Sequence, residues 1–278
     1  MNLFELDEQK MAQVVAGFQV PVRPEILSEI DDLMAEKEPN IGAVANLIAS
    51  DVGLSATILK IINSPLYGMN RRISEIKQAV LMLGLNTINS LVTATLLKQS
   101  FTGKASISLE RFWDDANDIA NAMTFLGGKV ENNIPVEMLY TIGLFHNCGI
   151  PLLALKYADY KEVLIEANTA DNFIAVEERH YQTNHAVLGY YISSSWHLPK
   201  ELCQLILQHH DNSFFSSSVE SECKVALATL KAAENIVERA KRFNYAPMWQ
   251  EYESLYLDVL GISSVDYNEF EADFAEIF

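Results

Sequence analysis

LYTIGLFHNCGIPLL, residues 139–153, combines a long apolar run with an imidazole, a carboxamide and a thiol. Its apolar positions and its histidine recur at helical spacing: Leu139, Ile142, Gly143 and His146. This spacing predicts a helix with His146 on the buried face. Gly149 and Pro151 are predicted to end that helix, because proline disfavours helical geometry at the residue before it. The stretch therefore predicts polar side chains at the inner end of a core helix.

Helical periodicity recurs along nearly the whole chain, whereas strand-like alternation is scarce, and this predicts an all-α, multi-helix bundle. The predicted parts are an N-terminal helix within 1–17, a helical lobe of 18–106, a second lobe of 107–242, and acidic helices in 243–278 that pack back on the bundle. The two lobes are divided near TGKASIS, residues 102–108, because small polar residues favour a loop.

The formal charge is −17 and the sequence pI is about 4.7. No Lys/Arg cluster offsets this charge, because Arg71-Arg72 and Lys241-Arg242 are isolated pairs. Binding to the phosphate backbone of a nucleic acid requires a basic protein surface, so we expect no nucleic-acid binding. The same argument predicts no binding to anionic membranes.

Cysteine usage and the chain's first residues predict a cytoplasmic protein. Cys148, Cys203 and Cys223 are odd in number and widely spaced, which favours reduced thiols over a disulfide framework. The acidic start MNLFELDEQK lacks the basic-then-apolar order of a signal peptide. We also expect no membrane span, since no apolar run approaches about 18 residues.

Several polar side chains fall on otherwise apolar helical faces. Asp115 is predicted to share a buried stripe with Phe112, Ile119, Ala122 and Leu126. His185 and Glu234 lie on two further apolar faces, and His209 and His210 end another predicted helix. One inward histidine is more often a hydrogen-bonded core residue than a metal ligand. Convergence of several such groups would indicate either a metal site or a closed hydrogen-bond network, because an unpaired buried charge is costly.

Residues 63–92, NSPLYGMNRRISEIKQAVLMLGLNTINSLV, resemble the N-terminal signature of the HDOD family, the HD-related output domains. The matching residues are Asn63, Ser64, Tyr67, Gly68, Ile73, Ser74, Ala79, Leu83 and Gly84. Later matches are FWDDA at 112–116, GLFHNCG at 143–149, HAVLGYYISSSWHLP at 185–199 and the histidine pair at 209–210. The resemblance covers roughly 18–212, and helix 219–242 fits the closing helix of the fold.

The resemblance also implies a site, because HDOD domains are related to the HD metal-dependent phosphohydrolases. Those enzymes hold metal with a His, a His-Asp pair and a later Asp. Here the first His falls at or beside Asp115, the pair becomes His146-Asn147, and the final Asp falls at Glu234 or Asn235. The histidines that resemble accessory ligands are His185, His209 and His210.

Two departures from that pattern weaken the implied metal site. The neutral amide of Asn147 supplies no charge, and Asp115 exchanges a nitrogen ligand for oxygen. Asp115, His146 and Glu234 would then form a vestigial site, with no resident cofactor expected and a divalent metal as the alternative.

The resemblance implies a non-catalytic signalling module that binds signalling proteins in a bacterial regulatory pathway. The alternatives are a metal-dependent phosphohydrolase with an altered ligand set, and a small-molecule sensor whose pocket replaces the metal site. The sequence leaves the partner, the stimulus and the oligomeric state open.

Overall fold

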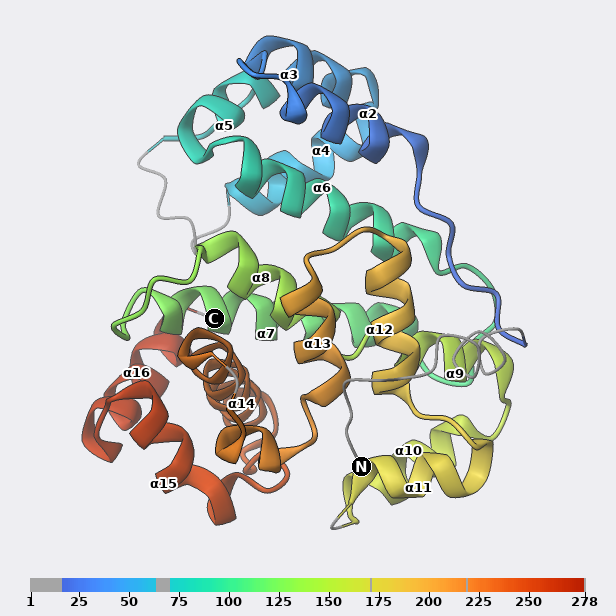
Figure 1. Cartoon of the computed structure of the whole chain (residues 1–278), viewed down its shortest axis with the longest axis vertical. Helices are drawn as coiled ribbons and strands as arrows, with labels where there is room; N and C mark the ends of the chain where they lie inside the picture. Colours follow the sequence, from blue (N-terminus) through green and yellow to red (C-terminus); the bar gives the residue numbers. More distant parts are fainter. Residues whose placement is uncertain (1–16, 64–70, 171, 219, 278) are drawn as a thin grey trace.

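The computed structural model describes residues 17–63, 71–170, 172–218 and 220–277 (Figure 1). Within these ranges the chain forms α-helices, one short 3₁₀ helix and no β-strand, which confirms the all-α prediction. The predicted helix within 1–17 lies outside the described residues, apart from Gly17 at its end.

The first lobe packs five helices around an apolar interior: α2 (Glu25–Ala35), α3 (Ile41–Ser50), α4 (Val52–Ile62), α5 (Ile76–Leu83) and α6 (Leu85–Ser100). Asn40 and Asp51 begin α3 and α4 by accepting hydrogen bonds from backbone N–H groups in the first turn. The Asn63 side chain makes two hydrogen bonds of 2.8 Å with the backbone of Ile73. Asn63 therefore ties the end of α4 to the segment that leads into α5.

The second lobe contains α7 (Leu109–Gly127), α8 (Val136–Phe145), α9 (Ile150–Lys156), α10 (Tyr160–Asn168), α11 (Phe173–Tyr181), α12 (His185–Ser195), α13 (Lys200–Gln208), η2 (Asn212–Ser216) and α14 (Ser221–Arg242). The packing of α8 against α7 depends on Gly143. A Cβ atom there would lie 2.6 Å from the Cα of Ala120, so only glycine permits this approach. Buried residues of both lobes belong to one continuous core.

The C-terminal helices α15 (Trp249–Leu260) and α16 (Ser264–Ile277) lie against α14 (Figure 1). Trp249, Tyr267 and Phe274 are buried between them and the bundle. Asn235 of α14 holds this layer, because its side chain donates to the Tyr267 hydroxyl at 2.9 Å and accepts from the Ala246 N–H at 3.0 Å.

The predicted end of the core helix is wrong in one respect. The helix α8 ends at Phe145, and Pro151 lies in the first turn of α9 instead of terminating α8. A first-turn residue needs no N–H donor, so proline begins a helix as readily as it ends one.

The same segment revises the expectation about apolar runs. Within the described residues, Val136–Lys156 is long and apolar enough to cross a membrane, but 83% of its most apolar window is buried inside the protein. The helices α3 and α4 pass the same test only as a pair bent by 113°. The apolar character of Val136–Lys156 is thus accounted for by its place in the core.

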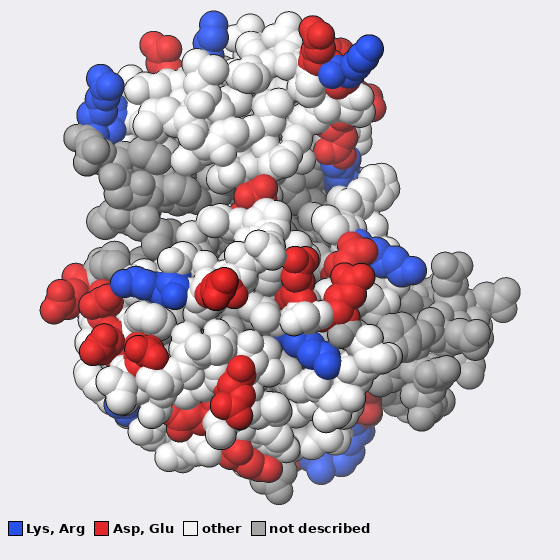
Figure 2. Space-filling model, turned by 60° about the vertical axis from the view of Figure 1, so that its left-hand side comes forward, with Lys and Arg blue, Asp and Glu red and all other residues white. Residues whose placement is uncertain are grey.

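Charge is divided unevenly between the lobes. Residues 107–278 hold 26 acidic and 11 basic side chains, whereas residues 18–106 hold 8 of each. Figure 2 shows many acidic side chains on the second lobe, in the lower part of the view. Residues 107–278 therefore carry most of the chain's excess negative charge, and a negative potential raises the local concentration of cations.

Candidate metal centre

Three histidines from the second lobe meet in one cluster. His185 is the first residue of α12, and His209 and His210 directly follow α13. The short connection 196–199 turns the chain back, so the start of α12 lies beside the end of α13 (Figure 1). Their candidate ligand atoms all lie within 4.8 Å of one another. A helical hairpin therefore brings together residues that are 24 and 25 positions apart.

The ring nitrogens have the spacing of ligands around a metal ion. The Nε2 atom of His185 lies 3.0 Å from Nε2 of His210 and 3.3 Å from Nε2 of His209. With Zn–N bonds of about 2.0–2.1 Å, two nitrogens of a tetrahedral site lie about 3.3 Å apart. In each of His185 and His209, Nδ1 lies 2.7 Å from an oxygen acceptor and so carries the proton. Their Nε2 lone pairs consequently face each other, an arrangement that a cation between them would stabilise.

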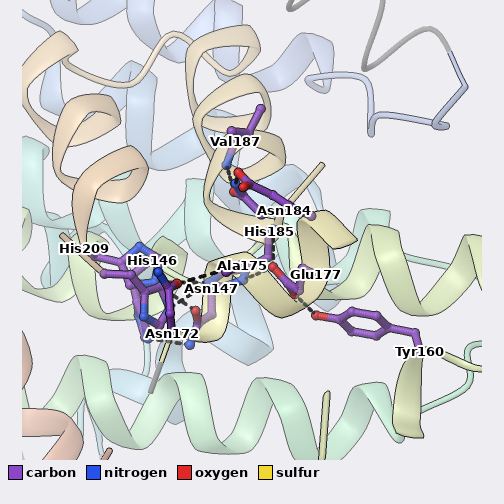
Figure 3. A network of polar contacts seen from close by, with 12 residues as sticks. His146, Asn147, Tyr160, Asn172, Ala175, Glu177, Asn184, His185, Val187 and His209 are labelled. Atoms are coloured by element: carbon purple, nitrogen blue, oxygen red, sulfur yellow. Dashed lines mark hydrogen bonds and ion pairs between the residues drawn. The ribbon is translucent and has the colours of Figure 1, made fainter. Parts of the chain in front are cut away.

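Two buried residues that the sequence analysis did not identify support His185. The Glu177 carboxylate accepts from the His185 Nδ1–H at 2.7 Å and from the His185 backbone N–H at 2.8 Å. The Tyr160 hydroxyl donates to the other Glu177 oxygen at 2.5 Å. Figure 3 shows Tyr160, Glu177 and His185 in a row that leads toward His146 and His209. Glu177 lies four residues after Phe173 and beside Val176, so its helical spacing was the available signal.

His146 and Asn147 lie beside the three-histidine cluster, at the end of α8. The His146 Nδ1–H donates to the Gly143 carbonyl at 2.7 Å, and its Nε2 accepts from the Asn147 amide at 2.8 Å. The Asn147 carbonyl oxygen lies 3.2 Å from His209 Nε2. The amide thus occupies the space between two imidazoles (Figure 3).

The close approach of α12 to this turn depends on Gly149. A Cβ atom at Gly149 would lie 2.0 Å from the carbonyl oxygen of His185. No side chain fits at that distance, so glycine is required for the start of α12 to pack here. Gly149 therefore brings His185 next to the segment that carries His146 and Asn147.

Glu234, and not Asn235, faces the histidines. Its Oε1 lies 3.4 Å from His146 Nε2, whereas the Asn235 side chain forms hydrogen bonds with Tyr267 and Ala246. The other Glu234 oxygen accepts a hydrogen bond of 2.9 Å from Lys231, which lies one turn earlier on α14. The Lys231 ammonium thereby offsets the charge of Glu234.

The prediction that Asp115 shares the buried stripe of α7 is wrong. Its side chain is 33% exposed, and the buried stripe instead follows Trp113, Ala116, Ala120 and Met123. One residue rotates a helix face by about 100°, which places the carboxylate at the edge of the stripe. There it pairs with Lys241 at 2.7 Å and Arg242 at 2.5 Å. Burial raises the pKa of Asp115, but these two partners outweigh it and hold that pKa below its usual value.

Burial keeps the inner imidazoles neutral. His146 and His209 are each 1% exposed. Desolvation lowers the pKa of His146 to about 4, although the Glu234 charge opposes the shift. Desolvation, followed by the neighbouring His210 and His185, lowers the pKa of His209 well below its usual value. Neutral imidazole is the form that binds metal, so this environment favours coordination over protonation.

The donor set fits a transition-metal ion. Three imidazole nitrogens suit Zn²⁺, Cu²⁺, Ni²⁺ or Fe²⁺, whereas Mg²⁺ and Ca²⁺ prefer oxygen. His185 and His209 are buried, while His210 is exposed, so the cluster is accessible from the His210 side. The sequence predicted all three residues only as accessory histidines, and the structure places them at the centre.

Comparison with known proteins is consistent with this architecture. The sequence profile of the HDOD domain family matches residues 20–212. An uncharacterized protein of Treponema pallidum is 25% identical over 197 residues, which are 69% of this chain and 38% of that protein. The chain spans less than half the length of the curated relatives it matches.

Three solved structures share the fold. An HDOD domain protein of unknown function from Geobacter sulfurreducens has a TM-score of 0.71 at 22% identity, over 98% of this chain and 99% of its own. A Shewanella amazonensis protein, whose name suggests a phosphohydrolase, has a TM-score of 0.71 at 20% identity, over 97% and 93%. The MmoQ response regulator of Methylococcus capsulatus has a TM-score of 0.51 at 20% identity, over 92% and 98%.

Proposed function

Because the chain belongs to the HDOD family, we propose that it is a regulatory module that acts through protein partners, and that His185, His209 and His210 hold one transition-metal ion in it. The observation that carries the proposal is that none of the three residues implied by the HD pattern is a free carboxylate that faces the histidines. Asn147 is an amide held between two histidines, Glu234 is paired with Lys231, and Asp115 pairs with cations at the surface.

At these three positions the chain lacks the unpaired carboxylates that bind metal for phosphoester hydrolysis in the HD enzymes. A metal pair needs carboxylates that bridge and offset two dications, and none of the three side chains is free to do so. Neutral imidazoles remain, and they suit one ion. Bound metal would join α12 to the end of α13 and stabilise that arrangement of the second lobe.

Metal analysis and phosphodiesterase assays on the same preparation test the proposal. We expect about one zinc, nickel or iron ion per chain, lost in a His185→Ala, His209→Ala double variant. Asp115→Asn is the matched control and should retain the metal, because its carboxylate lies outside the cluster. Hydrolysis of bis(p-nitrophenyl) phosphate should not exceed that of the double variant.

A second function, metal-dependent phosphohydrolysis, is favoured by one observation. Three imidazoles with one accessible side are an arrangement that catalytic zinc sites use, with water in the fourth position. Phosphodiester turnover that is proportional to metal content, and that disappears in His209→Ala, would establish this function and overturn the regulatory one. The names of the similar structures divide in the same way, between a phosphohydrolase and a response regulator.

The regulatory half of the proposal is tested by partner capture from the native host with crosslinking. We expect the same protein to be recovered with the wild type and with Asp115→Asn. Failure to recover any partner under conditions that retain the metal would count against a role through protein contacts.

A further inference from the structure

We propose that Glu177 supplies, from outside the ligand set, the negative charge that the metal centre lacks, and that Tyr160 fixes this carboxylate. The inference rests on the metal site proposed above and names positioning residues for it. Neither residue belongs to the set implied by the HD pattern, and neither would touch the metal.

The need for such a charge follows from the ligands. Three neutral imidazoles bring no anion to a dication, and a buried charge without compensation is costly. Asn147 is neutral, and Lys231 offsets Glu234. Glu177 is fully buried and forms no ion pair with a lysine or arginine of the described residues. It is therefore a carboxylate whose charge is available to the histidine centre.

The hydrogen bonds of Glu177 occupy both of its oxygens and fix its orientation. One oxygen accepts from two N–H groups of His185, at 2.7 and 2.8 Å, and the other accepts from the Tyr160 hydroxyl. Both oxygens act as acceptors, which is the pattern of a carboxylate. Burial, together with the Glu177 charge, raises the pKa of Tyr160, so its hydroxyl remains a donor.

The effect on the metal would pass through His185. A carboxylate that accepts from Nδ1–H holds the proton on that nitrogen and increases the basicity of Nε2. His185 Nε2 is the atom that lies 3.0 and 3.3 Å from the other two candidate ligands. Glu177 therefore both orients the ligand and strengthens it.

A purely structural role for Glu177 makes a different prediction. Its contact with the His185 backbone N–H ties α11 to the start of α12, and its contact with Tyr160 ties α11 to α10. If this were all, Glu177→Gln would lower stability equally with and without metal. A charge-supplying role instead lowers metal affinity itself.

Zinc affinity, measured by competition with a chromophoric chelator, separates the two roles. We expect Glu177→Gln to weaken Zn²⁺ binding by about 10- to 100-fold. Tyr160→Phe should weaken it by a smaller factor, because the carboxylate remains. Glu162→Gln, an exposed carboxylate on the neighbouring α10, is the matched control and should bind as wild type does. Nitrogen-15 NMR of the metal-free protein should show the Nδ1–H tautomer of His185, and a mixture of tautomers in Glu177→Gln.

The outcomes distinguish this inference from the proposed function. A wild-type protein that binds no Zn²⁺ overturns both. Wild-type binding with unchanged affinity in Glu177→Gln overturns only the role of Glu177. If Glu177→Gln does not fold, Tyr160→Phe decides: weaker binding with the usual fold supports the inference, and unchanged binding contradicts it.

Discussion

Lys231 and Glu234 lie one turn apart on α14, and the Lys231 ammonium donates a 2.9 Å hydrogen bond to the carboxylate that faces His146. Both side chains are largely buried, with exposed fractions of 12% and 19%. The cation therefore lies where it reduces the attraction of Glu234 for any other positive charge. It also lowers the pKa of His146, although by less than burial does.

Replacing Lys231 should strengthen metal binding. In Lys231→Met the Glu234 charge is no longer offset, and an interaction of roughly 1 kcal/mol at this depth corresponds to about a fivefold gain in Zn²⁺ affinity. Chelator competition measures it. Lys224→Met, on the same helix but bonded to the Ser217 carbonyl, is the control. An unchanged affinity in Lys231→Met would show that Glu234 does not act on the metal.

Asn147→Asp should destabilise the metal-free protein and increase its response to metal. The substitution removes the amide donor to His146 and places a carboxylate beside two Nε2 lone pairs. We expect a loss of roughly 1–3 kcal/mol without metal. Bound Zn²⁺ would offset this loss of stability, because the metal ion gains the new carboxylate of the variant as an anionic neighbour. Thermal unfolding should show a larger Zn²⁺-induced rise in Tm than in wild type, and an equal or smaller rise would contradict the prediction.

The stability of the metal-free protein should fall between neutral pH and about pH 4. The pKa of His146 is near 6.5 when unfolded and about 4 when folded, so in this window the unfolded chain binds more protons. The stabilisation is present above pH 6.5 and is lost as the pH falls. For His146 alone, the loss between pH 7 and pH 5 is roughly 2 kcal/mol.

Urea unfolding in the presence of a chelator, at pH 7 and pH 5, measures this effect. Between pH 7 and pH 5, the unfolding free energy of the wild type should fall by roughly 2 kcal/mol more than that of His146→Gln. Equal losses in the two proteins would mean that folding does not lower the pKa of His146.

Gly149→Ala should be strongly destabilising. Its Cβ atom would meet the carbonyl oxygen of His185 at 2.0 Å, so α12 has to move away from the turn. Overpacking of this kind costs about 1–3 kcal/mol or more, and Zn²⁺ affinity should fall because His185 moves with its helix. Gly53→Ala is the control: its Cβ would lie 3.5 Å from Asp51, and alanine favours a helix. A wild-type Tm for Gly149→Ala would exclude this close contact.

Most of the fold could be predicted from the sequence, because periodicity and capping residues are local signals. Asn40, Asp51 and Asn184 begin helices by accepting from backbone N–H groups, as their residue types indicate. The segment at 145–151 was harder. Gly149 and Pro151 permit both the end of one helix and the start of the next.

The candidate site was predicted less completely. The inward orientation of His146 and His185 followed from spacing, and both are buried. Asp115 was misplaced because a helical pattern locates a face only to within about one residue, or about 100°. Glu177 was overlooked because a single carboxylate on a short helix is usually solvated.

The sequence by itself determined the helices, their inner faces and the resemblance to the HDOD family. Only the tertiary structure decided which inward groups meet, because helices far apart in the chain must pack before their side chains share a site. It brought His185 to His209 and His210, placed Glu234 instead of Asn235 toward His146, and set Glu177 behind His185. Local spacing fixes the direction of a side chain around its own helix axis, but the distance between two helices depends on the packing of both.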